Sequence, residues 1–281
     1  MNQRNDEKIG TLFLIPTPIG NLGDLTLRSL DTLKEVDLLL CEDTRHTQIL
    51  LEHYQIKTPK LSFHEHNSKQ RIPEVVDKLK SGLNLGLVSD AGMPVISDPG
   101  VDLVSTLRKQ KIPVFALPGA NAATTALVGS GFPAIPYTFL GFLPRNAKEI
   151  KETLDHIYDQ TIIFYESPYR LLKTVKVIET IDPIWQLCTA RELTKIHEEY
   201  FAGSADEVLR HYEEFPPKGE FVVLLAPRTK KLTVPAKDQW VEIIKHEIDN
   251  GISPNTAIKN FAKKYQLERK IVYDVYHMIK Q

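Results

Sequence analysis

This sequence has few of the features that mark secreted, membrane-spanning or disulfide-rich proteins. Its 281 residues include two cysteines, Cys41 and Cys188, with no CxxC spacing. Two such cysteines make no disulfide framework, and both lie in apolar, strand-like runs, so we expect buried, reduced thiols. No apolar run approaches the length of a transmembrane helix. The polar start MNQRNDEKIG has no apolar signal-peptide core, so we expect a cytoplasmic protein.

Common catalytic and nucleotide-binding motifs are also missing. There is no GxxxxGK[ST] loop and no GxGxxG, which disfavours ATP-type phosphate binding and a dinucleotide fingerprint. HExxH and GxSxG are absent as well. His64-Glu65-His66 holds a close histidine pair, but no third ligand follows at a suitable spacing. Solvated or RNA-facing histidines are therefore favoured, and we expect no metal.

A strong charge of one sign is missing too. The net charge is −1, but residues 228–281 hold 11 Lys and Arg against 6 Asp and Glu, a net of +5. The preceding residues hold 24 basic against 30 acidic side chains, a net of −6. An acidic body argues against broad, non-specific affinity for nucleic acid, whereas a basic tail permits contacts with phosphate.

The sequence does contain a series of short apolar runs, each followed by a polar loop and a helical pattern. The composition, 42% hydrophobic and 25% charged, is that of a globular chain long enough for one large or two ordinary domains. The first five runs are residues 11–15, 36–41, 61–64, 85–89 and 113–117. This alternation indicates a mainly parallel α/β sheet, whose strands share a carboxyl edge. The candidate site is expected at that edge, near Pro16, Glu42, His64, Asp90 and Pro118.

The loop after the run at residues 85–89 is long and rich in Gly, Pro and Asp. A polar, glycine-containing loop between a strand and a helix is where open α/β sheets bind their ligands. We expect Asp90 in this loop to contact a ligand. Asp98 precedes Pro99, a pair typical of an N-cap and a first helical residue, so we expect Asp98 to cap the next helix. Asp24 is expected to cap the helix after the first strand.

The second half of the chain has fewer clean βα repeats, which indicates a mixed sheet. Strands are predicted at residues 137–142, 161–165, 185–190 and 219–226, and an extended segment at 197–202. Helices are predicted at 148–158, from Ser167-Pro168 to 181, and after a capping box at Ser204. We expect domains at residues 1–118 and 119–227, with a cleft between them as the ligand site.

Residues 228–281 are expected to form a linker and three helices. The helical patterns cover residues 239–250, 254–265 and 268–280, and the last two are joined by a short turn, as in a helix-turn-helix. Contact with RNA and a small packing or dimerisation module are equally compatible with this pattern.

Six motifs occur together and in order. They are PTPIGNLGD (16–24), CEDTR (41–45), GLVSDAGMPVISDPG (86–100), LPGAN (117–121), FYESPYR (164–170) and ARELTK (190–195). In these motifs the chain resembles the RsmI family, which methylates the 2′-hydroxyl of a cytidine in 16S ribosomal RNA of the small subunit. That family belongs to the tetrapyrrole methylase-like class of S-adenosylmethionine (SAM) enzymes. The resemblance covers residues 11–227 and, more weakly, the helical tail.

The resemblance implies a two-domain tetrapyrrole methylase-like fold, with a parallel α/β domain, a mixed-sheet α/β domain and a small helical module. It also implies a cytoplasmic homodimer that binds SAM in the cleft between domains. Tetrapyrrole methylases carry a GxGPGD-type loop after the first strand, where this chain has PTPIGNLGD. That departure argues against a porphyrinoid substrate. Methylation of a tetrapyrrole or another small molecule is the alternative, and a non-enzymatic RNA-binding module is the third hypothesis.

The resemblance also implies roles for individual residues. Residues expected around SAM are Pro18, Asp90, Ala91, Gly92, Met93, Gly119, Asn121, Ala122, Tyr165, Ala226 and Pro227. Residues expected on the RNA side are Glu42, Arg45, Asn67, Arg170 and Arg191, of which Arg45 and Arg170 are the best phosphate contacts. A base near the 2′-hydroxyl would assist the transfer, and Asp43, His64 and Glu65 are candidates among which the sequence does not choose.

Overall fold

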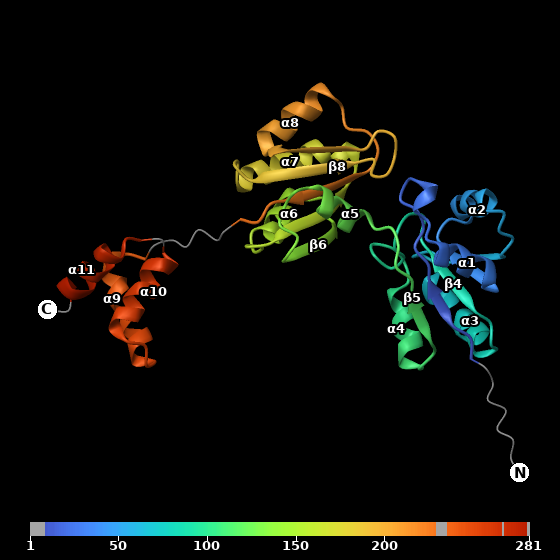
Figure 1. The fold of residues 1–281 in the computed structure, drawn as a ribbon, viewed down its shortest axis with the longest axis horizontal. Coiled ribbons are helices and arrows are strands. Elements are labelled where there is room, and N and C mark those ends of the chain that lie inside the picture. The colour runs from blue at the N-terminus through green and yellow to red at the C-terminus, as the bar shows by residue number, and fades with distance from the viewer. Residues whose placement is uncertain (1–8, 229–234, 266, 280–281) are drawn as a thin grey trace, which may run out of the picture. The chain divides into compact units, whose positions relative to one another are not determined.

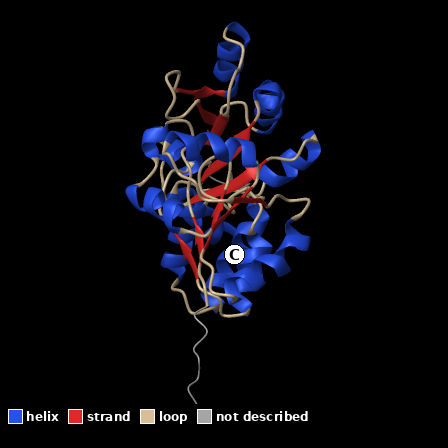
Figure 2. Cartoon of the chain, turned by 90° about the vertical axis from the view of Figure 1, so that its right-hand side faces the viewer, coloured by secondary structure: helices blue, strands red, loops and turns tan. Residues whose placement is uncertain are grey.

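The computed structural model describes residues 9–228, 235–265 and 267–279. The chain divides into two compact units, residues 1–228 and 229–281. The first unit holds two five-stranded sheets, one after the other along the chain, and the second holds three helices. Figure 1 shows both sheets with their helices, and Figure 2 shows the strands in red flanked by helices in blue. The predicted limits at residues 118 and 227 stay a prediction.

The N-terminal sheet is entirely parallel, as predicted. Its strands are β1 (Leu12–Leu14), β2 (Leu38–Cys41), β3 (Lys60–Ser62), β4 (Leu85–Val88) and β5 (Val114–Ala116), in the order β3-β2-β4-β1-β5. Its helices are α1 (Leu27–Glu35), α2 (Thr44–His53), α3 (Ser68–Lys80) and α4 (Val101–Lys109). Apolar residues of α3 and α4 pack on one face and those of α1 and α2 on the other. Both faces are covered, which explains why the strands are apolar runs without alternation.

The C-terminal sheet is mixed, which confirms the predicted fold class. Its strands are β6 (Tyr137–Phe142), β7 (Thr161–Glu166), β8 (Gln186–Arg191), β9 (Glu199–Ser204) and β10 (Phe221–Leu225), in the order β6-β7-β10-β8-β9. Only β6 and β7 are parallel, and the other pairs are antiparallel. Its helices are α5 (Ala122–Gly129), α6 (Ala147–Leu154), α7 (Pro168–Ile181) and α8 (Ala205–Glu214). Helices α6, α7 and α8 pack on one face and α5 on the other.

Local signals placed most helix starts correctly, with two exceptions. Ser204 forms the predicted capping box with Glu207, and α7 begins at Pro168. Asp24 instead ends a short 3-10 turn, and the side chain of Thr26 caps α1 by accepting a hydrogen bond from the Ser29 amide. The prediction for Asp24 was therefore wrong.

The prediction that Asp98 caps α4 was also wrong. The helix begins at Val101, and its N-cap is Gly100, with φ of 133° and no side-chain cap. Before it, the loop turns through positive φ values at Val95 (75°) and Ser97 (64°). These turns end the loop two residues later than the Asp-Pro signal indicates, so the Asp98 carboxylate does not cap α4.

The third strand is shorter than predicted, which moves the histidine pair off the sheet. Strand β3 ends at Ser62, and His64 follows it in the loop before α3. The His64 amide donates to Asn67 Oδ1 at 2.9 Å. Cys41 and Cys188 are buried free thiols, as expected, and burial raises the pKa of both.

The C-terminal unit consists of α9 (Lys237–Asp249), α10 (Pro254–Lys264) and α11 (Arg269–Ile279). Its core includes Trp240, Ile244, Ile258, Phe261 and Val272, contributed by all three helices. The unit therefore has an apolar core separate from the cores of residues 1–228. None of the helices in the described ranges is both long and apolar enough to cross a membrane.

Candidate active site

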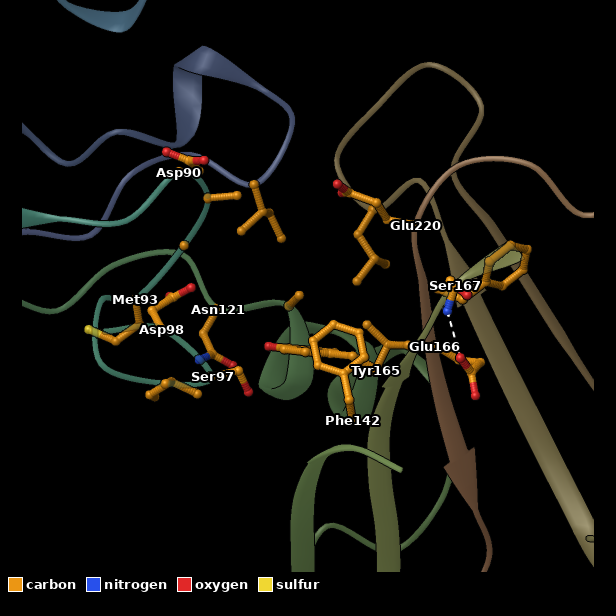
Figure 3. Close-up of a pocket in the computed structure, with 18 of the residues that line it drawn as sticks. Asp90, Met93, Ser97, Asp98, Asn121, Phe142, Tyr165, Glu166, Ser167 and Glu220 are labelled. Atoms are coloured by element: carbon orange, nitrogen blue, oxygen red, sulfur yellow. Dashed lines mark hydrogen bonds between the residues drawn. The ribbon is translucent and has the colours of Figure 1, made fainter. Parts of the chain in front are cut away.

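A pocket of about 410 Å³ lies in the first unit and is lined by residues that follow both sheets. Figure 3 shows it in close-up. The N-terminal sheet contributes the loop after β4, with Asp90, Met93, Ser97 and Asp98. The C-terminal sheet contributes the end of β7 and the start of β10, which lie side by side because Tyr165 pairs with Val222. Of the five positions predicted at the edge of the parallel sheet, Asp90 lines the pocket, whereas Pro16, Glu42, His64 and Pro118 do not.

The loop after β4 is tied to the loop after β1. The Thr17 amide donates to the Gly92 carbonyl at 2.9 Å, and the Gly92 amide donates to the Thr17 carbonyl at 3.1 Å. The Thr17 hydroxyl donates to the Ser89 carbonyl at 3.1 Å. Gly92 has φ of 83°, which favours glycine. These bonds hold the start of the loop, so the backbone beside Asp90 is fixed before any ligand arrives.

Gly20 lets the two halves of the first unit approach closely. A Cβ atom at this position would lie 2.9 Å from the Leu193 carbonyl oxygen and 2.6 Å from the Lys195 side chain. Neighbouring Ile19 and Leu193 both line the pocket. The PTPIGN turn therefore acts as a close packing point between the first strand and the loop after β8.

Carboxylates dominate one wall of the pocket. Asp90 and Asp98 both line it, and Figure 3 shows them on the same side. Burial raises the pKa of the Asp98 carboxyl to about 6, and the negative charges of Glu42 and Asp90 act in the same direction. Burial also raises the pKa of Glu42, with Asp90 again contributing. A wall of this kind attracts a cationic ligand, and its Asp98 carboxyl group is more basic than an exposed one.

Aromatic and apolar side chains make the opposite wall. The ring of Tyr165 lies edge-on to Phe139, at 4.9 Å between centroids, and to Phe142 at 5.6 Å. Burial raises the pKa of Tyr165, and the charge of Asp98, which also lines the pocket, acts in the same direction (Figure 3). Phe142 is 59% exposed. This wall is suited to a flat, partly apolar group.

The junction of β7 and α7 is held by a buried carboxylate. Glu166 Oε1 accepts from the Ser167 amide at 2.8 Å (Figure 3), and Oε2 accepts from the Thr174 hydroxyl at 2.6 Å. The Arg170 guanidinium lies 3.4 Å from Glu166 and donates to the Leu143 and Pro144 carbonyls at 3.0 and 2.7 Å. Arg170 is therefore part of the scaffold, which leaves its predicted contact with phosphate a prediction.

Seven of the residues predicted around SAM line the pocket. They are Asp90, Ala91, Gly92, Met93, Asn121, Ala122 and Tyr165. Asn121 also caps α5, since its Oδ1 accepts from the Thr124 amide at 3.0 Å. Pro18 and Gly119 are next to the pocket in sequence but do not line it, and a Cβ on Gly119 would collide with the Pro16 ring.

Ala226 and Pro227 lie away from the pocket. Strand β10 begins at the pocket, where Phe221 pairs with Glu166, and runs antiparallel to β7 as far as Leu225, which pairs with Ile162. Ala226 follows that far end, and its carbonyl accepts from Trp185 Nε1 at 2.7 Å. The structure therefore places these two residues outside the pocket, because the strand that carries them points away from it.

The three candidate bases are also outside the pocket lining. Asp43 caps α2 by accepting from the Arg45 amide at 2.8 Å, and its carboxylate lies 3.1 Å from the Arg45 guanidinium. These bonds lower the pKa of Asp43 to about 2, so it is a weak base. His64 and Glu65 lie in the turn after β3, where Asn67 bonds to the backbone.

The residues predicted on the RNA side do not come together at one point. The negative charge of Asp90 raises the pKa of Glu42, and the negative charge of Glu42 raises the pKa of Asp98. Arg45 is exposed at the start of α2. Arg191 lies 2.5 Å from Glu199, on the neighbouring strand β9. In the described part of the chain, no group of three or more His, Cys, Asp or Glu side chains is placed to hold a metal ion.

Sequence reasoning missed several residues that line the pocket. Asp98 was assigned to a helix cap, and Phe142 and Glu166 were treated as strand ends only. Glu166 directly follows a predicted strand, as Glu42 and Asp90 do, so the same signal was available for it. Glu220 precedes a strand in an antiparallel pair, a position that the rule for parallel strands does not cover.

Comparison with known proteins adds a family. The model of the family Tetrapyrrole (Corrin/Porphyrin) Methylases matches residues 11–209. The chain is 47% identical over 272 residues to ribosomal RNA small subunit methyltransferase I of Streptococcus pyogenes serotype M1, covering 95% of each chain. It is 42% identical over 286 residues to the protein of the same name from Bacillus subtilis (strain 168), covering 99% of this chain and 98% of that one.

A relative from Thermotoga maritima, also named ribosomal RNA small subunit methyltransferase I, is shorter. It is 48% identical over 220 residues, which are 99% of its own length and 78% of this chain. Among solved structures, uroporphyrin-III C-methyltransferase of Thermus thermophilus in complex with S-adenosyl homocysteine matches with a TM-score of 0.54. At 16% identity, over 77% of this chain and 97% of that one, it shows a shared fold.

Proposed function

This chain belongs to the tetrapyrrole (corrin/porphyrin) methylase family, and from that premise we propose that it is a SAM-dependent methyltransferase of small-subunit ribosomal RNA. The reaction proposed is methylation of a cytidine 2′-hydroxyl in 16S ribosomal RNA. The observation that carries this proposal is 47% identity, over 95% of both chains, to a protein named ribosomal RNA small subunit methyltransferase I.

The pocket fits SAM in size, charge and shape. Its volume of about 410 Å³ is within the range of small-molecule sites. The carboxylates of Asp90 and Asp98 suit the positive charges of the sulfonium and amino groups, and the Tyr165 ring suits a flat base. Asn121 and the backbone of residues 91–93 would complete the binding surface. When bound, SAM supplies a methyl group carried on a positively charged sulfur.

The attacking hydroxyl must lose its proton, and Asp98 is suited to accept it. Asp98 lines the pocket and has a pKa raised to about 6, so it is ionised at neutral pH and more basic than an exposed carboxylate. Below pH 6 it is protonated and accepts no proton. We add Asp98 to the three candidates from the sequence, one of which, Asp43, is a weak base because Arg45 lowers its pKa.

Substrate presentation and assembly are further parts of the proposal. We propose that the RNA is recognised within the small ribosomal subunit, in the cytoplasm, and that the protein is a homodimer. Support for a dimer comes from large apolar residues left exposed on the C-terminal half of the first unit, among them Val128 (82% exposed) and Ile135 (88%).

The decisive test is transfer of label from SAM to RNA. Small ribosomal subunits from cells that lack this protein are incubated with the purified chain and SAM labelled in its methyl group. Label in the RNA that maps to a cytidine ribose is the expected result. Label on a tetrapyrrole offered in parallel, with none in the RNA, would contradict the proposal. Calorimetry with SAM alone is the control, since absence of binding would exclude any SAM-dependent activity.

A further inference from the structure

A second, shallower cavity of about 660 Å³ lies between α6 and α7, apart from the pocket. Four of its eight lining residues are lysines, two on each helix. They are Lys148 and Lys151 on α6, and Lys173 and Lys176 on α7. All four are exposed, and Leu172 and Val177 provide apolar surface between them. We call this cavity the lysine groove.

Most of the positive charge in the lysine groove is not neutralised. Lys148 Nζ lies 3.8 Å from Glu152, and both side chains are largely exposed, at 82% and 61%. Within the described residues, no carboxylate lies within 4.0 Å of the amino groups of Lys151, Lys173 or Lys176. Residues 1–227 have a net charge of −6, so the groove is a local exception on an acidic body. Such an exception is suited to a polyanion.

Helix α7 connects the lysine groove to the pocket. Ser167 and Pro168, at its start, line the pocket, whereas Lys173, Lys176 and Thr180 line the groove. Residues 168 and 180 of one helix are about 18 Å apart at 1.5 Å per residue. The groove begins at Leu172, about one turn after Pro168, along a single helix.

Tyr169 lies between the two cavities and is 97% exposed. Tyr169, Lys173, Lys176 and Thr180 follow the spacing i, i+4, i+7 and i+11, so they share one face of α7. An exposed aromatic ring in line with lysines is a combination that binds single-stranded RNA, since bases stack on the ring and phosphates bind the cations.

We propose that the lysine groove binds the phosphate backbone of the RNA strand that leads to the target nucleotide, and that Tyr169 stacks on a base of that strand. This inference rests on the proposed function, because it names a contact surface for the same RNA substrate. It assigns the RNA a path along α7, in addition to the loops of the parallel sheet.

The test is the double variant Lys173→Glu/Lys176→Glu, compared with the exposed pair Lys34→Glu/Lys109→Glu at the ends of α1 and α4. Both change the net charge equally. We expect the groove variant to weaken RNA binding about 10-fold or more, and to reduce the slope of log K against log salt by about 1.4, or 0.7 for each lost contact with a single strand. The control pair should change both quantities little.

Tyr169→Ala provides an independent measurement that leaves the charge unchanged. We expect it to weaken RNA binding by about 5-fold or more, a loss in the range measured for one stacked base, with an unchanged salt slope. SAM affinity and thermal unfolding should match the wild type in all three variants, because none of these residues lines the pocket or the core.

Two results would overturn the inference. One is an RNA affinity of the groove variant equal to that of the wild type, and the other is an equal loss in the control pair, which would indicate net charge and not the groove. RNA affinity is measured without methyl transfer, so failure of the proposed reaction is a separate result. If the groove binds an acidic protein and not RNA, the groove variant will have the RNA affinity of the wild type, which is the first of these two results.

Discussion

The two sheets of residues 1–228 contribute different chemistry to the same pocket. The parallel sheet contributes Asp90 and Asp98, which both lie in the loop after its strand β4. The mixed sheet contributes Tyr165, Phe142 and other apolar groups, together with Glu166 and Glu220. In a parallel sheet every strand ends at the same edge, so polar loop residues accumulate there. In the mixed sheet one strand ends at the pocket and its neighbour begins there, so fewer loops and more strand residues line it.

The two walls of the pocket therefore contribute different properties to ligand binding. The carboxylate wall governs the protonation state and the attraction of a cation, whereas the aromatic wall governs the fit of a flat group. A substitution in the carboxylate wall is therefore expected to change a different property of the site from a substitution in the aromatic wall. The predictions below test that separation, beginning with the largest expected effect.

Replacing Asp98 by Asn should have the largest effect on the reaction. We expect kcat to fall by about 10²- to 10⁴-fold, the usual contribution of a positioned base, and SAM affinity to fall less, because Asp90 still supplies negative charge in the pocket. The rate of the wild type should rise with pH through about 6, as Asp98 loses its proton, and this rise should be absent from the variant.

Asp102→Asn is the matched control for this prediction. Asp102 lies in the first turn of α4, close in sequence to Asp98, and does not line the pocket. It should retain wild-type kcat. Equal kcat values for Asp98→Asn and the wild type would remove Asp98 from the reaction and leave the sequence-derived candidates.

Arg228→Ala should affect the mixed sheet at its far end, away from the pocket. The Arg228 guanidinium lies 4.2 Å from the Trp185 ring and 4.7 Å from the Tyr158 ring, and donates to the Leu154 carbonyl at 2.7 Å. Its loss should lower the free energy of unfolding by about 2 kcal/mol, measured by urea denaturation. SAM affinity should be retained at temperatures where the variant is folded.

Arg210→Ala serves as the control for Arg228, because its ion pair with Asp206 is largely exposed and so contributes little. Similar stability losses in the two variants would show that the ring contacts of Arg228 are not what stabilises the end of the sheet.

Replacing Tyr165 by Ala should alter the aromatic wall alone. We expect SAM to bind about 10-fold more weakly by calorimetry, equivalent to loss of one aromatic contact. The pH dependence of the rate should be retained. Tyr165→Phe keeps the ring and should bind SAM nearly as well as the wild type. If the two variants bind equally weakly, the hydroxyl and not the ring is responsible.

Removing residues 229–281 should have the smallest effect on the pocket. The three-helix unit has its own core, and the Thermotoga maritima relative has no counterpart for about a fifth of this chain. We expect unchanged SAM affinity and an increase of a few-fold in KM for RNA, because the basic tail is lost. The truncation must begin at Thr229, since Arg228 stabilises the first unit. Unchanged KM would show that the tail has no part in RNA recognition.

Much of the parallel sheet could be predicted from the sequence, because its signals are local. Apolar runs followed by helical patterns identify the strands, and the shared carboxyl edge then brings Glu42 and Asp90 together. The roles expected for Asn121 and Tyr165 came instead from the resemblance to the family motifs. Where a rule applies to neighbouring residues, as in the capping box at Ser204, the structure agrees.

The errors occurred where a local signal competed with a long-range one. Asp98-Pro99 has the residues of a helix start, but the loop needs its remaining turns to pack against Leu87 and the pocket, so the helix begins later. The resemblance implies that Ala226 and Pro227 are near SAM, and this stays a prediction, although they follow the end of β10 that lies away from the pocket lining.

The sequence by itself determined the fold class, the family motifs and the existence of a polar strand edge, because these depend on periodicity and on residues adjacent in the chain. Only the tertiary structure decided that Asp98 and Tyr165 line the same pocket, that Arg170 bonds to the scaffold, and that four lysines from two helices form one groove. These outcomes depend on which strands run in which direction and on which helices pack together. Such contacts join residues far apart in the chain, and no local pattern records them.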